Sequence, residues 1–308
     1  MSRHLQVAVG QYSDKGRKEL NQDFHGVCIP REPQLSAKGI AVALADGISS
    51  SQVSQEAAQS AVTGFMEDYY CTADAWSVKK SSEHVLTAVN SWLHSQTQHS
   101  QHRYDRERGY VCTFSALVIK STTAHLFHVG DARIYRLRGE QFEQLTEDHR
   151  VWISSQQSYL ARALGMDRKV EIDYLALQLE AGDLFLLATD GVYEHTDAPC
   201  VRAAIAAAPD LDTAARVIAD EALARGSGDN LTVQLVRIDE LPAPEANEVY
   251  RQLSDLPCPP LLDARDSFDG YQIVRVIKSG SRSHIYLAVD QASGERVVIK
   301  TPSVDMQA

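Results

Sequence analysis

The sequence lacks the features that mark membrane-spanning and secreted proteins. Its 308 residues contain no run of 18 or more apolar residues, and the N-terminal segment has no long apolar core. We therefore expect no transmembrane helix and no secretory signal peptide. The five cysteines are odd in number and show no Cys-x-x-Cys spacing, so neither a disulfide framework nor a zinc site is indicated. A reducing cytoplasm is the expected location.

The chain also has fewer basic residues than acidic ones. Lys and Arg total 30 against 41 Asp and Glu, which gives a formal net charge of −11. Such a chain repels phosphates, so we expect no nucleic-acid partner. The surplus carboxylates fit a solvated surface and also fit a set of metal ligands, and composition does not separate these readings. With 44% hydrophobic and 23% charged residues, the chain has the composition of a soluble globular protein.

Prolines are few and unevenly placed. Five of the ten fall within residues 242–260, and proline cannot donate to a strand ladder. We therefore predict a body over residues 1–240, a Pro-rich linker over 241–267 and a tail over 268–308.

Apolar runs of two lengths recur within the body. The longer runs have apolar residues spaced as on one face of a helix and predict helices over 53–70, 82–98 and 211–226, the last capped by Asp212 and ending at Gly226. The short runs predict buried strands at 5–12, 40–45, 113–119, 124–129, 184–189 and 231–238. Because strands and helices occur in separate blocks, we expect an α+β fold with stacked sheets flanked by helices.

Aspartates stand at the ends of these predicted strands. One alone is best explained as a turn residue, since Asp and Gly both favour turns. Five gathered at one edge of a sandwich would repel one another unless something positive lay among them. Oxygen ligands without cysteine indicate Mg²⁺ or Mn²⁺, and two such ions about 4 Å apart could activate a shared water for attack on phosphorus. The five are Asp23, Asp46, Asp131, Asp190 and Asp229.

Seven segments of the body also carry a family resemblance. In order they are SDKGRKELNQDF, ALADG, HVGDARIY, LTEDH, LARALG, GDLFLLATDG and SGDNLTV. They resemble the motifs of the metal-dependent PPM/PP2C serine/threonine phosphatases of bacterial type, over roughly residues 5–238. The resemblance implies an α-β-β-α sandwich of two antiparallel sheets flanked by helices. It also implies hydrolysis of phosphoserine and phosphothreonine in protein substrates by a hydroxide that bridges two Mn²⁺ or Mg²⁺ ions.

The resemblance assigns metal-binding roles to Asp46, Gly47, Asp190 and Asp229. Asp46 would bridge the two ions, and the carbonyl of Gly47 would complete one coordination shell. Asp190 and Asp229 would bind the other ion.

Two further aspartates have secondary roles in this assignment. Asp23 would hold the first-ion site through water, and Asp131 would support a weaker third ion together with Asp190. Asn230 and Thr232 are expected to shape the loop and the strand that carry the ligands.

The sequence departs from the family pattern around these ligands. Gln22 replaces the usual glutamate before Asp23, and Ser49–Ser51 replace a Gly-rich stretch. Ile48 stands where animal relatives carry a histidine that acts as a general acid, so water would protonate the leaving group. His149 of the LTEDH motif is expected to anchor its loop.

The phosphate-binding cation has two candidates. The family spacing, five residues before Asp23, falls on Lys18, with Arg17 one residue earlier. Arg17 is narrowly preferred because only arginine grips a phosphate with two parallel hydrogen bonds.

The tail has a pattern of its own. YQIVRVI, HIYLAVD and VVIK, separated by turn residues, predict a three-stranded meander. It resembles the first three strands of a eukaryotic-type protein kinase, with Lys300 in place of the nucleotide-binding lysine and only Gly280 left of the Gly-rich loop. No HRD-type or DFG-type motif follows, so we expect no kinase activity from this tail. A cognate Ser/Thr kinase would be a natural substrate of the phosphatase body.

Two other functions stay open at this point. The altered Gln22 and Ser49–Ser51 positions are compatible with a non-catalytic phosphoprotein-binding or scaffold module whose metal site has decayed. A phosphatase for small phosphate esters is the other alternative.

Overall fold

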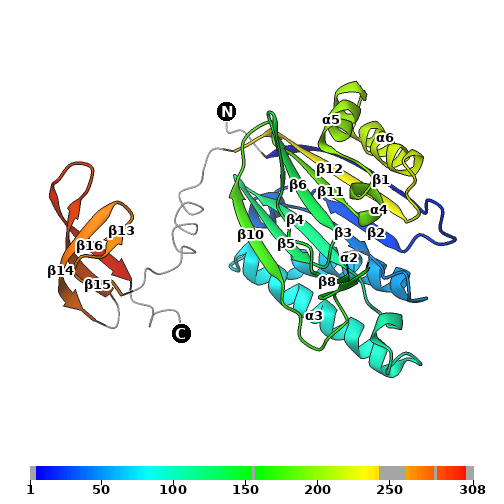
Figure 1. Ribbon diagram of the computed structural model, residues 1–308, viewed down its shortest axis with the longest axis horizontal. Coiled ribbons are helices and arrows are strands. Elements are labelled where there is room, and N and C mark those ends of the chain that lie inside the picture. Colours follow the sequence, from blue (N-terminus) through cyan, green and yellow to red (C-terminus); the bar gives the residue numbers. More distant parts are fainter. Residues whose placement is uncertain (1–4, 155–156, 243–260, 281–282, 303–308) are drawn as a thin grey trace. The chain divides into compact units, whose positions relative to one another are not determined.

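The structure is a computed structural model that describes residues 5–154, 157–242, 261–280 and 283–302 (Figure 1). The chain divides into two compact units, Met1–Pro244 and Glu245–Ala308. Most of the predicted linker, residues 243–260, lies outside the described residues. Among the described helices, none is long and apolar enough to cross a membrane.

The first unit is built on two five-stranded sheets whose neighbouring strands are all antiparallel. One sheet has the order β1 (Gln6–Asp14), β12 (Leu231–Glu240), β11 (Leu184–Ala188), β6 (Arg133–Arg138), β7 (Gln141–Gln144). The other has the order β10 (Asp173–Gln178), β5 (Thr123–Val129), β4 (Phe114–Lys120), β3 (Ile40–Asp46), β2 (Asp23–Cys28).

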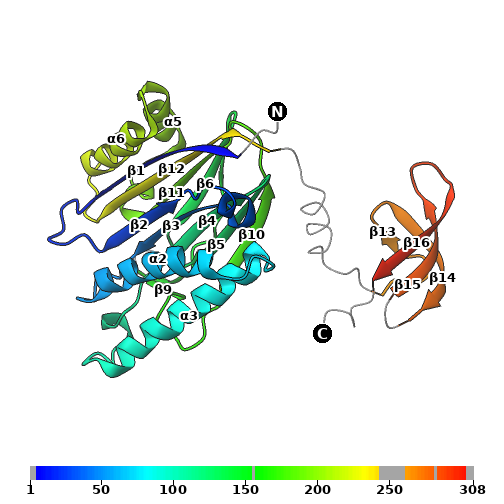
Figure 2. The same ribbon diagram turned by 180° about the vertical axis from the view of Figure 1, so that it is seen from behind.

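Helices cover both outer faces of this sandwich, as Figures 1 and 2 show. The longer helices are α2 (Ser54–Cys71) and α3 (Val78–His99) on the β2–β10 sheet, and α5 (Ala198–Ala207) and α6 (Leu211–Ala224) on the β1–β7 sheet. Shorter ones are α1 (Gln34–Lys38), the 3₁₀ turn η1 (Arg106–Arg108) and α4 (Asp190–Tyr193). The predicted α-β-β-α sandwich is therefore confirmed.

Strand β3 shows why so many strands read as unbroken apolar runs. Ala41, Ala43 and Ala45 pack against the helices. The residues between them, among them Val42 and Leu44, pack between the sheets. Side chains of a strand alternate between its two faces, and here both faces are buried, so no polar alternation is left in the sequence.

Helix α6 corrects one sequence prediction. Its N-cap is Asp210, whose Oδ1 accepts a hydrogen bond from the Thr213 amide at 2.7 Å. Asp212, the predicted cap, instead accepts a bond from the Gln11 amide at 2.8 Å. The prediction was off by two residues because both aspartates lie near the start of the helix and both are acceptable cap residues. The helix stops before Gly226, which has a φ of +104°, as expected for a C-terminal glycine.

A short hairpin lies beside the main sheets. Strands β8 (Arg150–Ser154) and β9 (Gln157–Leu160) pair only with each other among the described strands. This hairpin comes directly after the LTEDH motif, and it carries Arg150 into the carboxylate cluster described below.

The second unit is a four-stranded antiparallel sheet. Its strands in order are β13 (Ser267–Phe268), β14 (Tyr271–Ser279), β15 (Ser283–Asp290) and β16 (Arg296–Pro302). The two residues of β13 are too short to leave a periodic pattern, which is why the sequence predicted three strands. Leu262, Ile273, Tyr286 and Ala288 form its small core, so the unit starts before residue 268.

Candidate metal centre

The five strand-end aspartates meet at one edge of the sandwich. Asp23 opens β2 and Asp46 closes β3, and the two are directly opposite each other in the antiparallel register. Asp131 follows β5, Asp190 follows β11 by two residues, and Asp229 precedes β12. A cavity of about 120 Å³ is lined by Asp46, Asp131, Asp190 and Asp229. Aspartates far apart in sequence thus share one site.

Asp23 is the most buried member of this cluster, with 5% of its surface exposed. Its Oδ2 accepts hydrogen bonds from the hydroxyls of Thr189 at 3.0 Å and Thr232 at 2.6 Å. Its Oδ1 is buried and has no hydrogen-bond partner in the described structure. A buried carboxylate oxygen without a partner is costly, and it is an oxygen available to a cation or to the water of a cation's shell.

Burial and mutual repulsion disfavour the charged form of the aspartates in this cluster. Burial, more than the opposing hydrogen bonds from Thr232 and Thr189, raises the pKa of Asp23 to about 6. Burial and then the charges of Asp131 and Asp229 raise the pKa of Asp190 to about 7. The pKa of Asp46 lies well above its ordinary value because of burial and then the charge of Asp23. Bound cations would remove this repulsion.

Two cationic side chains stand at the rim of the cluster. The Lys18 Nζ lies 3.1 Å from Asp229 Oδ2 and 3.1 Å from the Ser49 hydroxyl. Arg17 points elsewhere, with its guanidinium 3.4 Å from the carbonyl of Leu223. Of the two predicted phosphate-binding cations, the geometry therefore places Lys18 beside the carboxylates.

The second rim cation, Arg150, was not predicted. Its Nε donates to Asp131 Oδ2 at 2.5 Å, one terminal nitrogen donates to Asp190 Oδ2 at 2.8 Å, and the other donates to Glu194 Oε1 at 3.0 Å. The LTEDH motif ends at His149, so the motif resemblance gave Arg150 no role. Its one sequence signal was its position directly after that motif.

The donor set fits hard divalent cations, although no coordination shell is preformed. Among the described residues, no three His, Cys, Asp or Glu side chains already converge as a shell. The rim contacts explain this, because Asp131, Asp190 and Asp229 each aim an oxygen at Arg150 or Lys18. The orphaned Asp23 oxygen and the all-oxygen donors suit Mg²⁺ or Mn²⁺ better than softer metals.

Gly47 and Gln22 define the wall behind Asp46. A Cβ on Gly47 would lie 2.7 Å from the Ser54 carbonyl oxygen, so only glycine fits there. The Gln22 side-chain nitrogen donates to the Ser51 carbonyl at 2.8 Å and to the Ser54 hydroxyl at 2.5 Å. A glutamate could not donate these bonds. The departure at position 22 thus ties the loop after Asp46 to the start of β2.

Asn230 and Thr232 hold the site together. The side-chain nitrogen of Asn230 donates to the carbonyls of Lys15 and Leu20 at 2.9 Å each. Its side-chain oxygen accepts a hydrogen bond from the main-chain amide of Gln22 at 2.8 Å. These bonds fix the loop that carries Lys18. The contacts agree with the predicted shaping roles.

The LTEDH segment is anchored in a similar way. The His149 ring accepts a hydrogen bond from the Gly130 amide at 3.0 Å, and its other nitrogen lies 2.9 Å from Asp173. Arg133 binds Asp148 through two bonds of 2.9 and 2.7 Å. His149 therefore has the geometry of a loop anchor, and its ring nitrogens are already occupied.

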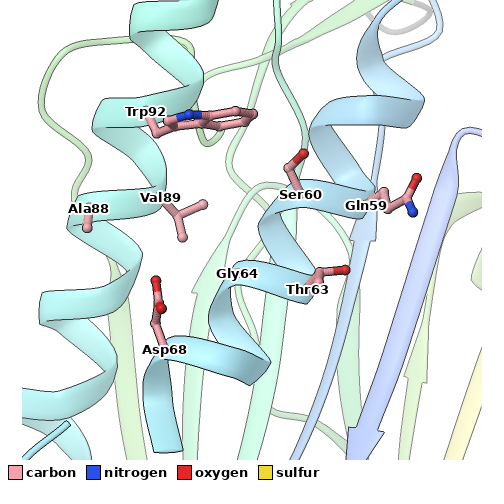
Figure 3. Close-up of a pocket in the computed structure, with 8 residues that line it drawn as sticks. All are labelled: Gln59, Ser60, Thr63, Gly64, Asp68, Ala88, Val89 and Trp92. Atoms are coloured by element: carbon pink, nitrogen blue, oxygen red, sulfur yellow. The ribbon is translucent and has the colours of Figure 1, made fainter. Parts of the chain in front are cut away.

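A different hollow lies on the helical layer. It measures about 510 Å³ and opens between α2 and α3. Figure 3 shows Trp92 and Val89 projecting from α3 towards α2, Trp92 on the side of Ser60 and Val89 on the side of Gly64. Asp68 is the single carboxylate in the lining of this hollow, so the hollow offers no ligand set comparable to that of the strand-end cluster.

Sequence comparison decides the family. The model of protein phosphatase 2C matches residues 11–225. The chain belongs to this family. The match includes Lys18 and the four aspartates from Asp23 to Asp190, and it ends just before Asp229. The predictions of the family and of an enzyme of the protein phosphatase class are confirmed.

Curated relatives carry matching names. Protein phosphatase PhpP of Streptococcus pneumoniae is 26% identical over 254 residues, which cover 76% of this chain and 98% of that protein. Serine/threonine phosphatase stp of Listeria monocytogenes is 28% identical over 253 residues, which cover 74% of this chain and 94% of that protein.

Solved structures support the fold. The Mycobacterium tuberculosis serine/threonine phosphatase PstP/Ppp superposes with a TM-score of 0.63 at 22% identity, over 76% of this chain and 99% of that one. The PstP catalytic domain in complex with two manganese ions superposes with a TM-score of 0.63 at 21% identity, over 77% of this chain and 100% of that one.

Lys300 lies in the second unit. It is an exposed residue of β16, opposite Ile285 of β15. Strands β14, β15 and β16 are neighbours in chain order, as the meander prediction required.

Proposed function

We propose that the chain hydrolyses phosphoserine and phosphothreonine in proteins and uses two divalent cations, Mn²⁺ or Mg²⁺. The observation that carries the proposal is the buried pair Asp23 and Asp46, whose raised pKa values and orphaned oxygen call for cations from outside the chain. The names of PhpP and stp support the reaction class.

The chain's own residues would have distinct roles in holding the two ions. Asp46 faces the cavity and would contact both ions, with Asp190 and Asp229 beside it. Thr189 and Thr232 hold one Asp23 oxygen in place and leave the other free. When bound, two such ions would supply a water acidic enough to attack phosphorus at neutral pH.

Lys18 would receive the substrate phosphate. Its side chain is 33% exposed at the rim and its ammonium is held by Asp229 and Ser49, so it can meet an incoming anion at the surface. A lysine attracts phosphate as a point charge, without the two parallel bonds of arginine. The Asn230 bonds keep the loop of Lys18 in register with Asp229.

Phosphate release from a phosphothreonine peptide tests this proposal. The full chain should release phosphate with Mn²⁺ and stop when a chelator is added. A parallel assay with a small aryl phosphate compares the small-ester alternative, which predicts a higher kcat/KM for the small ester. No release of phosphate from either substrate by a folded protein that binds Mn²⁺ would remove the proposed function.

The scaffold alternative makes a different prediction. A decayed site should bind Mn²⁺ weakly and hydrolyse nothing. The presence of all five aspartates at one edge argues against decay, because mutually repelling buried carboxylates are costly without a use. Gln22, the main departure, is fully engaged with Ser51 and Ser54 and does not block the cavity.

For the second unit, we propose the beginning of a protein kinase-like domain that has no phosphotransfer activity in this chain. The order of β14, β15 and β16 and the position of Lys300 on β16 support it. A cognate Ser/Thr kinase would then be a natural substrate of the first unit. Incubation of the chain with Mg-ATP should give no autophosphorylation.

A cytoplasmic location is part of the proposal. The four cysteines in the described part of the chain are all free thiols, which fits a reducing compartment.

A further inference from the structure

Arg150 occupies the position where a third cation was expected. Family resemblance led us to expect Asp131 and Asp190 to support a weaker third ion. In the structure, each of these aspartates gives an oxygen to the Arg150 guanidinium, at 2.5 and 2.8 Å. Glu194 completes the set at 3.0 Å. All three kinds of guanidinium nitrogen are therefore engaged by carboxylates.

This ion pair is better enclosed than the other one at the rim. The side chains of Arg150 and Asp131 are 16% and 10% exposed, whereas those of Lys18 and Asp229 are 33% and 38% exposed. A planar guanidinium with several simultaneous bonds loses less freedom per bond than a lysine ammonium does. Displacing Arg150 would therefore leave its charge poorly compensated in a half-buried place.

Counting charges favours two ions over three. Together with Glu194, the partner of Arg150 at the rim, the five aspartates of the cluster make six carboxylates. Arg150 and Lys18 neutralise two of these charges, and two divalent ions would neutralise the remaining four. A third divalent ion would leave the cluster with excess positive charge unless Arg150 moved away.

We propose that Arg150 is a built-in cation that takes the place of a third divalent ion, so that the chain binds two ions where an Arg150-free site would bind three. The same contacts make Arg150 a positioning residue, because it begins β8 and ties the β8–β9 hairpin to Asp131 and Asp190. The proposal rests on the proposed function only in assuming that this cluster binds divalent cations.

Native mass spectrometry of the full chain with increasing Mn²⁺ tests the proposal. The wild-type protein should saturate at two Mn²⁺ per chain, and Arg150→Gln should take a third. Arg150→Gln combined with Asp131→Asn should return to two, because the third ion then lacks a ligand. Three ions in the wild type, or two in Arg150→Gln, would overturn the proposal.

A matched control separates the local effect from net charge. Arg237→Gln removes one positive charge from β12, where Arg237 pairs with the exposed Asp239, and should keep two ions. If Arg237→Gln also gains an ion, the gain in Arg150→Gln reflects net charge and the proposal fails. If Arg150→Gln does not fold, Arg150→Lys provides a second test. Lysine retains the charge, so this variant should stay at two, and a third ion in it would contradict the proposal.

Phosphate release from the same samples keeps this inference apart from the proposed function. Two bound ions without any hydrolysis would remove the function and leave the role of Arg150 standing. Hydrolysis by a wild-type chain that binds three ions would do the reverse.

Discussion

The inner and outer carboxylates of the cluster differ in how their charge is held. Asp23 and Asp46 form no ion pair with Lys or Arg within the described residues, and burial raises the pKa of both. The outer aspartates have cationic partners, Arg150 for Asp131 and Asp190, and Lys18 for Asp229. Within the described residues, the chain thus supplies cationic partners to the outer aspartates and none to the inner pair.

Asp46→Asn should have the largest effect on this arrangement. It removes the carboxylate that faces all the others, and we expect kcat/KM to fall by about 10³-fold or more, which is ~4 kcal/mol of transition-state stabilisation. Asp190→Asn should behave similarly. Phosphate release with saturating Mn²⁺ measures both. Asp220→Asn, on the exposed face of α6, is the control. Rates like those of the wild type in Asp46→Asn would show that the inner pair is not the catalytic centre.

Thr232→Val should weaken metal binding without changing its stoichiometry. The substitution keeps the side-chain shape and removes the 2.6 Å hydrogen bond that orients Asp23. Loss of such a supporting contact lowers metal affinity by about 10- to 100-fold. Calorimetric titration with Mn²⁺ measures it, and Thr87→Val on the exposed side of α3 serves as the reference. Equal affinities would mean that Asp23 needs no orientation.

Lys18→Ala should raise KM more than it changes kcat. A hydrogen bond to a charged group contributes about 1.5–3 kcal/mol, which corresponds to about 10- to 100-fold in phosphate-ester binding. Arg17→Ala should change little, because Arg17 points to the Leu223 carbonyl. Steady-state kinetics of the two alanine variants distinguishes the candidates. A larger defect in Arg17→Ala would restore the preference drawn from the sequence.

The metal-free protein should lose stability as pH rises. The pKa values of Asp23 and Asp190 are about 6 and about 7 in the folded state, against an ordinary 3.8. The folded state therefore binds more protons than the unfolded state between about pH 4 and 7. The free energy of unfolding should fall across this window and level off above it. Urea unfolding with chelator at several pH values measures this, and Asp190→Asn should flatten the slope. A rise in stability over the same window would contradict the raised pKa values.

Removal of residues 245–308 should have the smallest effect. Every residue of the cluster lies in the unit Met1–Pro244, so kcat/KM for a phosphothreonine peptide should change by less than about twofold. A large loss of activity with intact metal binding would show that the second unit takes part in substrate recognition.

The sequence predicted the framework better than it predicted the contacts. Buried strands such as β3 and β12 were recognisable because their apolar runs are continuous, and the aspartates at their ends were recognisable by position. Strands β2, β6, β7 and β10 and the β8–β9 hairpin were not predicted, because each of these strands is only four to six residues long and contains polar or charged residues. The α6 cap was misplaced because Asp210 and Asp212 are both acceptable cap residues.

The rim of the site was harder to predict for a physical reason. Whether Arg17 or Lys18 faces the carboxylates depends on the backbone direction of one loop, which the distant Asn230 fixes. The contacts of Arg150 with Asp190 and Glu194 span 40 and 44 residues in sequence. No local pattern encodes such pairs, so only the fold reveals them.

In the proposed function, Asp46 would hold both divalent ions. Electron paramagnetic resonance of the chain with two equivalents of Mn²⁺ tests this most directly, because ions that share a ligand couple magnetically. We predict a spin-coupled dimanganese signal in the wild type and its loss in Asp46→Asn. A six-line signal of isolated Mn²⁺ in the wild type, at two bound ions per chain, would contradict the account.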